Sequence, residues 1–87
     1  RSSDLKRALG MLLETYLPGA STGEKLHHAG EETGTLLEGQ IVLEINGQQF
    51  HLSAGESYVI DTGLPHSFTN LADVPCRIVS AHTPANF

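Results

Sequence analysis

Glycine and proline interrupt this chain so often that long helices have little room to form. The nine glycines and four prolines stand at positions 10, 18, 19, 23, 30, 34, 39, 47, 55, 63, 65, 75 and 84. Because both residues break helices and mark turns, the segments between them hold only short elements. These segments are rich in Val, Ile, Leu, Thr, Tyr and Phe, and they read MLLETYL, TGTLLEG, QIVLEI, QQFHL, SYVI, HSFT and CRIVSAH. Short strands at regular spacing, with no helix to cover a sheet, predict an all-β sandwich or barrel.

The stretch QIVLEINGQQFHL gives the most specific local prediction. Asn46 and Gly47 can supply the two positive φ angles of a type I′ turn. Before that turn, Ile41, Leu43 and Ile45 alternate with other residues, as expected for a strand with one buried face. The stretch therefore predicts a β-hairpin.

Residues 1–10 are ambiguous. Ser3 or Asp4 offers an N-cap and the following residues have helical spacing, but Gly10 argues for a change of structure. We expect residues 1–10 to be a linker or a lead-in to the first strand, and residues 11–87 to form one barrel domain.

Charge and cysteine content exclude several classes of protein. Ten acidic against five basic side chains give a formal net charge of -5, so the chain is not expected to bind DNA by itself. Its only cysteine, Cys76, cannot form an internal disulfide and is most simply a small buried apolar residue. No apolar run reaches the roughly 18 residues of a membrane span. We therefore expect a cytoplasmic protein with no membrane partner.

Two stretches carry candidate chemistry. In GEKLHHAGEETGTLLEG, His28 and Glu32 would lie about 13 Å apart on a straight strand, and a turn at Ala29 and Gly30 would bring them together. In GESYVIDTGLPHSFTN, His66 follows a glycine and proline turn and begins the next strand. Both histidines are therefore expected at strand starts.

The second of these stretches resembles a motif of the cupin family. That motif is glycine, five residues, Pro-x-Gly, two residues, histidine, three residues, asparagine. Gly55, Gly63, His66 and Asn70 match it at its spacing, with Asp61 where proline is usual. The resemblance implies a small cupin-type double-stranded β-helix, a jelly-roll barrel.

The first stretch resembles the other cupin motif, which ends with His-x-His, three or four residues, glutamate, six residues and glycine. His28, Glu32 and Gly39 match, whereas Leu26 stands where the first histidine belongs. Cupins bind a divalent metal with three histidines and one glutamate, so the resemblance implies a site for Zn, Ni, Mn or Fe formed by His28, Glu32 and His66. Leu26 removes the fourth ligand, which favours a hydrogen-bonded polar cluster with no required cofactor.

A closer resemblance extends over residues 11–87. The stretches ETYLPGASTGE, GEETGTLLEGQIVLEINGQQFHL, GESYVIDTGLPHSF and CRIVSAHTP resemble the C-terminal half of putrescine-utilisation repressors. The resemblance implies a diamine effector such as putrescine, a homodimer, and contact with DNA only through a helix-turn-helix domain ahead of Arg1. The chain begins RSSDLKR without an initiator methionine, and we expect it to be the C-terminal part of a longer protein.

Glu14 and Tyr16 share one face of the first predicted strand. If that face lies inside the barrel, both could contact a ligand opposite Glu32; if it lies outside, they are surface groups. Leu12 and Leu13 supply an apolar residue to each face, so alternation leaves both alternatives open. The remaining histidines, which are expected to be exposed or locally satisfied, are His27, His51 and His82.

Two functions follow as alternatives. The first is an effector-sensing and dimerising domain of a bacterial transcriptional repressor, which is not an enzyme. The second is a small metal-dependent cupin enzyme, an oxygenase or isomerase, with His28, Glu32 and His66 as metal ligands. The incomplete first motif and the absence of any recognisable nucleophile–base–carboxylate pattern favour the sensor. A barrel that only dimerises, with a vestigial pocket, is a third alternative.

Overall fold

The computed structural model describes residues 10–22 and 29–83, and within these ranges all regular elements are β-strands. The strands are β1 (Gly10–Tyr16), β2 (Glu31–Glu38), β3 (Gln40–Ile45), β4 (Gln48–Ser53), β5 (Ser57–Asp61), β6 (His66–Thr69) and β7 (Cys76–Thr83). Each coincides with one of the segments predicted from the sequence, so the all-β prediction is confirmed. The N-cap proposed at Ser3 or Asp4 lies outside the described residues.

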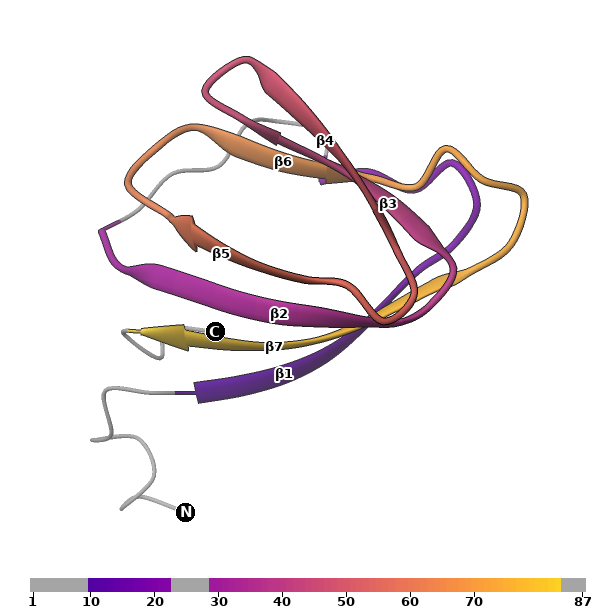
Figure 1. Cartoon of the computed structure of the whole chain (residues 1–87), viewed down its shortest axis with the longest axis horizontal. Helices are drawn as coiled ribbons and strands as arrows, with labels where there is room; N and C mark the ends of the chain where they lie inside the picture. Colours follow the sequence, from indigo (N-terminus) through magenta and orange to yellow (C-terminus); the bar gives the residue numbers. More distant parts are fainter. Residues whose placement is uncertain (1–9, 23–28, 84–87) are drawn as a thin grey trace.

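The strands form two antiparallel sheets that lie one above the other (Figure 1). The lower sheet has four strands in the order β1-β7-β2-β5, and the upper sheet has three in the order β4-β3-β6. In the four-stranded sheet β7 lies between β1 and β2, so β7 pairs directly with one strand that starts 66 residues earlier and one that starts 45 residues earlier. This long-range pairing decides which side chains meet inside the barrel.

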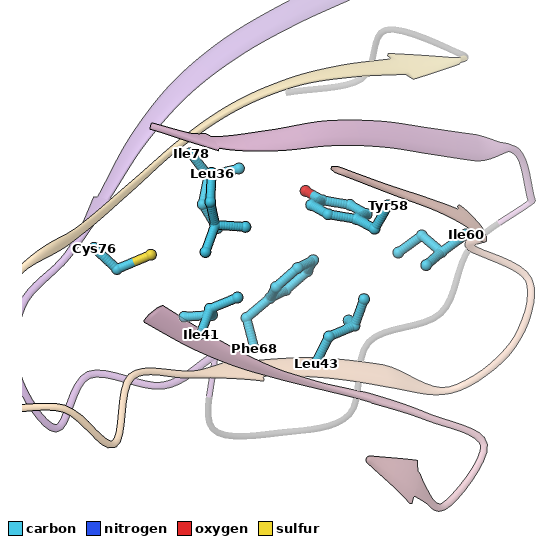
Figure 2. Close-up of a cluster of buried hydrophobic side chains, with 8 residues drawn as sticks. All are labelled: Leu36, Ile41, Leu43, Tyr58, Ile60, Phe68, Cys76 and Ile78. Carbon is cyan, nitrogen blue, oxygen red and sulfur yellow. The ribbon is translucent and has the colours of Figure 1, made fainter. Parts of the chain in front are cut away.

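The core lies between the two sheets. Side chains from both inner faces meet there, and Figure 2 shows Leu36, Tyr58 and Ile78 on one side facing Leu43 and Phe68 on the other. The cluster consists of Leu36, Ile41, Leu43, Tyr58, Ile60, Phe68, Cys76 and Ile78. Cys76 is fully buried, which confirms its assignment as a small apolar residue.

The predicted hairpin is present between β3 and β4. Asn46 has φ 51° and Gly47 has φ 88°, the two positive values that the turn requires. Ile41 and Leu43 are 1% and 2% exposed, so the expected alternation points them into the core. His51 on β4 is exposed, as predicted.

Two residues of the second motif hold loops in place. At the end of β5, the Asp61 carboxylate accepts a hydrogen bond from the Gly63 amide at 2.8 Å, which stabilises the turn where the cupin motif has proline. After β6, the buried Asn70 side chain donates to the carbonyls of Tyr16 and Val74, both at 2.9 Å. Asn70 thereby joins the end of β1 to the loop before β7.

Across residues 10–22 and 29–83, the structure contains no helix long and apolar enough to cross a membrane.

Candidate ligand-binding site

The inner face of the four-stranded sheet carries a row of polar side chains around Glu32. Glu32 on β2 is 5% exposed and pairs in register with His82 on β7. The Tyr58 hydroxyl on β5 donates a hydrogen bond of 2.6 Å to Glu32 Oε2, and His82 Nδ1 lies 3.4 Å from Glu32 Oε1. Both carboxylate oxygens of Glu32 therefore face a protein donor group.

A glycine makes the contact between Tyr58 and Glu32 sterically feasible. Gly34 lies opposite Tyr58 in the β2–β5 ladder. A Cβ atom at Gly34 would lie 2.5 Å from the Tyr58 ring atom Cζ, closer than any packed pair of carbon atoms. Because Gly34 has no side chain, the Tyr58 ring can lie across β2 and bring its hydroxyl to Glu32.

His82 extends the row on β7. Its Nε2 atom lies 2.8 Å from the Ser80 hydroxyl, while its Nδ1 atom faces Glu32. A neutral imidazole with its proton on Nδ1 donates toward Glu32 and accepts from Ser80. The bond to Ser80, two residues away, is the local hydrogen bonding expected for His82. The β2–β7 register in addition places His82 beside Glu32.

The connectivity of Ser80, His82 and Glu32 is that of a nucleophile, a base and an orienting carboxylate. This arrangement cannot be read from the sequence, because Glu32 comes next to Ser80 and His82 only through the pairing of β2 with β7. Ser80 is 2% exposed, so its hydroxyl does not face a space that a substrate could enter. We therefore assign the row to hydrogen bonding.

Of the two alternatives for Glu14 and Tyr16, the structure shows the inward one. Along β1 the intermediate burial of Leu12, Glu14 and Tyr16 alternates with exposure of their neighbours, so Glu14 and Tyr16 lie on the inner face. Burial is the main cause that raises the pKa of Glu14, and the negative charge of Glu32 raises it further, whereas His82 opposes the shift. The carboxylates of β1 and β2 thus share one electrostatic environment.

The two tyrosines near these carboxylates remain neutral. Burial raises the pKa of Tyr16 well above its usual value, and the charges of Glu14 and Glu32 add to the effect. Burial also raises the pKa of Tyr58, and its hydrogen bond to Glu32 stabilises the protonated phenol. Both phenols therefore keep their O–H proton, and Tyr58 donates its proton to Glu32.

Among residues 10–22 and 29–83, neither lysine nor arginine lies on this inner face. Arg77 is the one such residue within the described ranges, and it lies 3.7 Å from Glu38, with both side chains largely exposed. Within the described part of the chain, the cluster of Glu14 and Glu32 is therefore acidic, and the imidazole of His82 is the basic group that faces it.

His66 begins β6 on the opposite sheet and also points inward. It is 2% exposed, its ring meets Phe68 edge to face at 6.3 Å, and its Nδ1 atom lies 2.9 Å from the Leu64 carbonyl oxygen. Because a carbonyl oxygen only accepts, Nδ1 carries a proton and Nε2 is the atom that would bind a metal. The neighbouring turn thus fixes the orientation of this ring.

The predicted convergence of His28, Glu32 and His66 stays a prediction, because His28 lies outside the described residues, as do Leu26 and His27. Within the part of the chain that is described, no group of three His, Cys, Asp or Glu side chains is arranged to hold a metal ion. The two oxygens of Glu32 are directed at the Tyr58 hydroxyl and the His82 imidazole.

Neither cupin motif selects Tyr58, Ser80 or His82 as a site residue. Alternation along SYVI and CRIVSAH does place Tyr58 on a face with Ile60, and Ser80 and His82 on a face with Ile78. What the sequence does not contain is the register that sets those faces against Glu32.

The described residues also form an apolar hollow beside this row. It lies between the edge strands β4 and β5 and has a volume of about 210 Å³. Its lining consists of Leu43, Ile45, Phe50, Leu52, Ser57, Tyr58, Val59 and Ile60. Tyr58 thus contacts both the hollow and the buried carboxylate.

Comparisons with known proteins agree with this architecture. A family model described as the cupin domain matches residues 12–82. The HTH-type transcriptional regulator PuuR of Escherichia coli is 62% identical over 81 residues, which are 93% of this chain and 44% of that protein. The chain therefore spans less than half the length of this relative.

Solved structures confirm the fold class. A double-stranded β-helix protein from Klebsiella pneumoniae superimposes with a TM-score of 0.79 at 26% identity, covering 91% of this chain and 70% of that one. A cupin sugar phosphate isomerase from Silicibacter pomeroyi has a TM-score of 0.77 at 24% identity, covering 88% of this chain and 51% of that one. At that identity the second match shows the shared fold alone.

Proposed function

This chain belongs to the cupin family, and we propose that it is the effector-sensing and dimerisation domain of a bacterial transcriptional repressor that responds to a small polyamine such as putrescine. Its similarity to an HTH-type regulator supports a regulatory role. In this proposal the protein acts in the cytoplasm as a homodimer, and a helix-turn-helix domain outside this chain contacts DNA. The domain senses a ligand and catalyses no reaction.

The observation that carries the proposal is the pair of inward carboxylates, Glu14 on β1 and Glu32 on β2, with no lysine or arginine beside them among the described residues. Tyr58 and His82 direct donor groups at Glu32, but no lysine or arginine of the described residues balances the two carboxylates, and a buried carboxylate without a paired charge is costly. A diamine carries two ammonium groups, one for each carboxylate, joined by a methylene chain that suits the apolar inner walls.

Neighbouring side chains complete the proposed site. The Tyr16 hydroxyl extends from the same face of β1 as Glu14, and it can hydrogen-bond an ammonium group. His66 contributes from the opposite sheet, and His28 is included because it matches the first cupin motif. The proposed ligand-binding residues are Glu14, Tyr16, His28, Glu32 and His66.

Calorimetry tests the proposal. We expect putrescine to release heat on binding, a monoamine with the same carbon chain to bind more weakly, and a dicarboxylate not to bind. Glu32→Gln should weaken putrescine binding by roughly 10- to 150-fold, because a charge-assisted contact contributes about 1.5 to 3 kcal/mol. The matched control is Glu31→Gln, which removes a charge from the adjacent residue on the exposed face of β2.

Equal heats for the three ligands would contradict diamine sensing, and so would equal effects of Glu31→Gln and Glu32→Gln. Metal analysis of protein purified without chelators addresses the enzyme alternative separately. About one ion per chain, lost in His66→Ala, would favour the metal-dependent enzyme.

A further inference from the structure

The outer face of the four-stranded sheet has an uncharged centre. Two rows of side chains cross it in register, one from Met11 to Val59 and the other from Leu13 to Ser57. Met11 is 68% exposed, Leu13 is 54% exposed and Val59 is 72% exposed. We call these two rows the outer patch, and its members are Met11, Ala81, Thr33, Val59, Leu13, Val79, Thr35 and Ser57.

The polar groups of the outer patch already have partners within the sheet. The Thr33 hydroxyl donates to the Tyr58 backbone carbonyl at 2.9 Å, and the hydroxyls of Thr35 and Ser57 lie 2.8 Å apart. Covering the patch would therefore leave none of these three hydroxyls without a hydrogen bond. The apolar gain from covering Met11 and Val59 is not offset by a large desolvation cost.

The outer face of the three-stranded sheet differs in character. Its outward positions carry the amide, imidazole and carboxylate side chains of Gln40, Glu44, Gln49 and His51 around Val42, which is 8% exposed. Such a face is stable in water without a partner. Of the two outer faces, only that of the four-stranded sheet lacks charge and amide groups across its centre.

Charges at the two ends of the outer patch select one way of pairing two copies. Glu31 and Asp61 pair in register at one end, whereas Arg77 lies at the other end, beside Glu38. A two-fold axis parallel to the strands would bring the acidic ends of the two copies together. A two-fold axis across the strands keeps the acidic ends apart and sets each of them opposite the Arg77–Glu38 pair of the other copy, in which the two charges balance.

We propose that a second copy of this chain covers the outer patch, with the two-fold axis running across the strands. Two antiparallel four-stranded sheets then pack face to face at about 10 Å, as in β-sandwiches. Each copy presents the same patch, which is the self-complementary contact that two-fold symmetry requires. This inference rests on the homodimer of the proposed function and adds its surface and orientation.

Sedimentation velocity of the 87-residue chain tests the surface. Val59→Lys places a charge in the patch on an edge strand that tolerates lysine when exposed, and it should weaken dimerisation roughly tenfold or more. The matched control is Leu71→Lys, because Leu71 is 73% exposed and lies outside both sheets. The control should remain as dimeric as the parent chain.

The outcomes separate this inference from the proposed function. A dimeric parent chain whose Val59→Lys variant stays equally dimeric would overturn the surface and leave homodimerisation standing. A monomeric parent chain would overturn both the surface and the homodimer, while the calorimetric test of diamine binding would be unaffected.

Charge reversal tests the orientation. Arg77→Glu should weaken the dimer several-fold at low salt, because it sets a carboxylate near Glu31 and Asp61 of the other copy. Adding Glu31→Arg to the same chain should restore dimerisation, because opposite charges then meet again. A double variant as weak as the single one would overturn the axis across the strands.

Discussion

At the residue scale, the environment of the buried carboxylate of Glu32 depends on a glycine at position 34. Gly34 leaves the space in which the Tyr58 ring lies, and Tyr58 directs its hydroxyl at Glu32. Gly34 and Tyr58 stand at positions that the two cupin motifs leave unspecified, so motif matching does not identify them. Their roles follow from the β2–β5 register, which sets one opposite the other.

Gly34→Ala should destabilise the domain by about 1 to 3 kcal/mol, because the added methyl group overlaps the Tyr58 ring and forces it to move. The free energy of unfolding from urea titration is the measurement. Displacement of Tyr58 also removes the 2.6 Å hydrogen bond to Glu32, so near-ultraviolet circular dichroism of the tyrosines should change.

The control for this substitution is a background without the ring. In a Tyr58→Leu chain the overlap is absent, and Gly34→Ala should then be neutral or stabilising by about 0.5 to 1 kcal/mol, since alanine suits a strand better than glycine. An equal loss of stability in both backgrounds would show that Tyr58 is not the reason for glycine at this position.

At the scale of elements, the sequence predicts what is local. The positive φ angles of Asn46 and Gly47 and the inward alternation of Ile41 and Leu43 could be predicted because both depend on neighbouring residues. The inner face of β1 could not be predicted, because Leu12 and Leu13 supply an apolar residue to each of its two faces. That face is settled by pairing with β7, more than 60 residues away, which sets Leu12 opposite Ser80.

In the candidate site, too, the residues that a local motif marks could be predicted, and those placed by distant strand pairing could not. Glu32 and His66 could be selected from motif spacing, and both are buried. His82 has no motif and lies on a strand whose partner, β2, starts about 45 residues earlier. Contacts between distant strands depend on register, which the pattern of one isolated segment does not encode.

Asn70→Ala should be strongly destabilising because this side chain connects three segments. Asn70 is fully buried, donates to the carbonyls of Tyr16 and Val74, and accepts from the Ala72 amide at 3.0 Å. Each buried backbone group left without a partner costs about 1 to 3 kcal/mol, so the total loss should be about 3 kcal/mol or more. Urea titration measures it.

Leu71→Ala serves as the neighbouring control. Leu71 is 73% exposed, and its truncation should change the free energy of unfolding by less than about 0.5 kcal/mol. A loss for Asn70→Ala as small as that of Leu71→Ala would contradict the assignment of Asn70 as the residue that joins β1 to the loop before β7.

At the scale of the whole molecule, this small chain divides its apolar residues between the core and one outer face. Leu36, Ile41 and Ile78 fill the interior, whereas Met11 and Val59 remain exposed on the outer patch. A domain of 87 residues buries a smaller share of its surface than a large one does. Covering the outer patch with a second copy would add apolar burial without enlarging the core.

The acidic interior links the stability of the molecule to pH. Burial and the charge of Glu32 raise the pKa of Glu14 in the folded state, and the unfolded chain retains the ordinary value near 4.5. A raised carboxyl pKa means that the folded state binds the proton more tightly. The resulting stabilisation is fully present below the ordinary pKa and is lost as the pH rises through the raised pKa.

Glu14→Gln should remove this part of the pH dependence. Between about pH 4 and about pH 7, the parent chain should lose stability relative to the Glu14→Gln variant as Glu14 ionises beside Glu32. The measurement is the difference between their thermal midpoints at each pH.

Saturating putrescine should reduce the loss in the parent chain, because the ammonium groups stabilise the ionised carboxylates and their binding releases a proton. Asp73→Asn, which alters an exposed carboxylate in the loop before β7 and outside the outer patch, should run parallel to the parent chain. If the difference between the parent chain and Glu14→Gln is constant across this range, then Glu14 does not titrate in the shared interior environment. In that case Glu14 would not serve as the second anchor for a diamine.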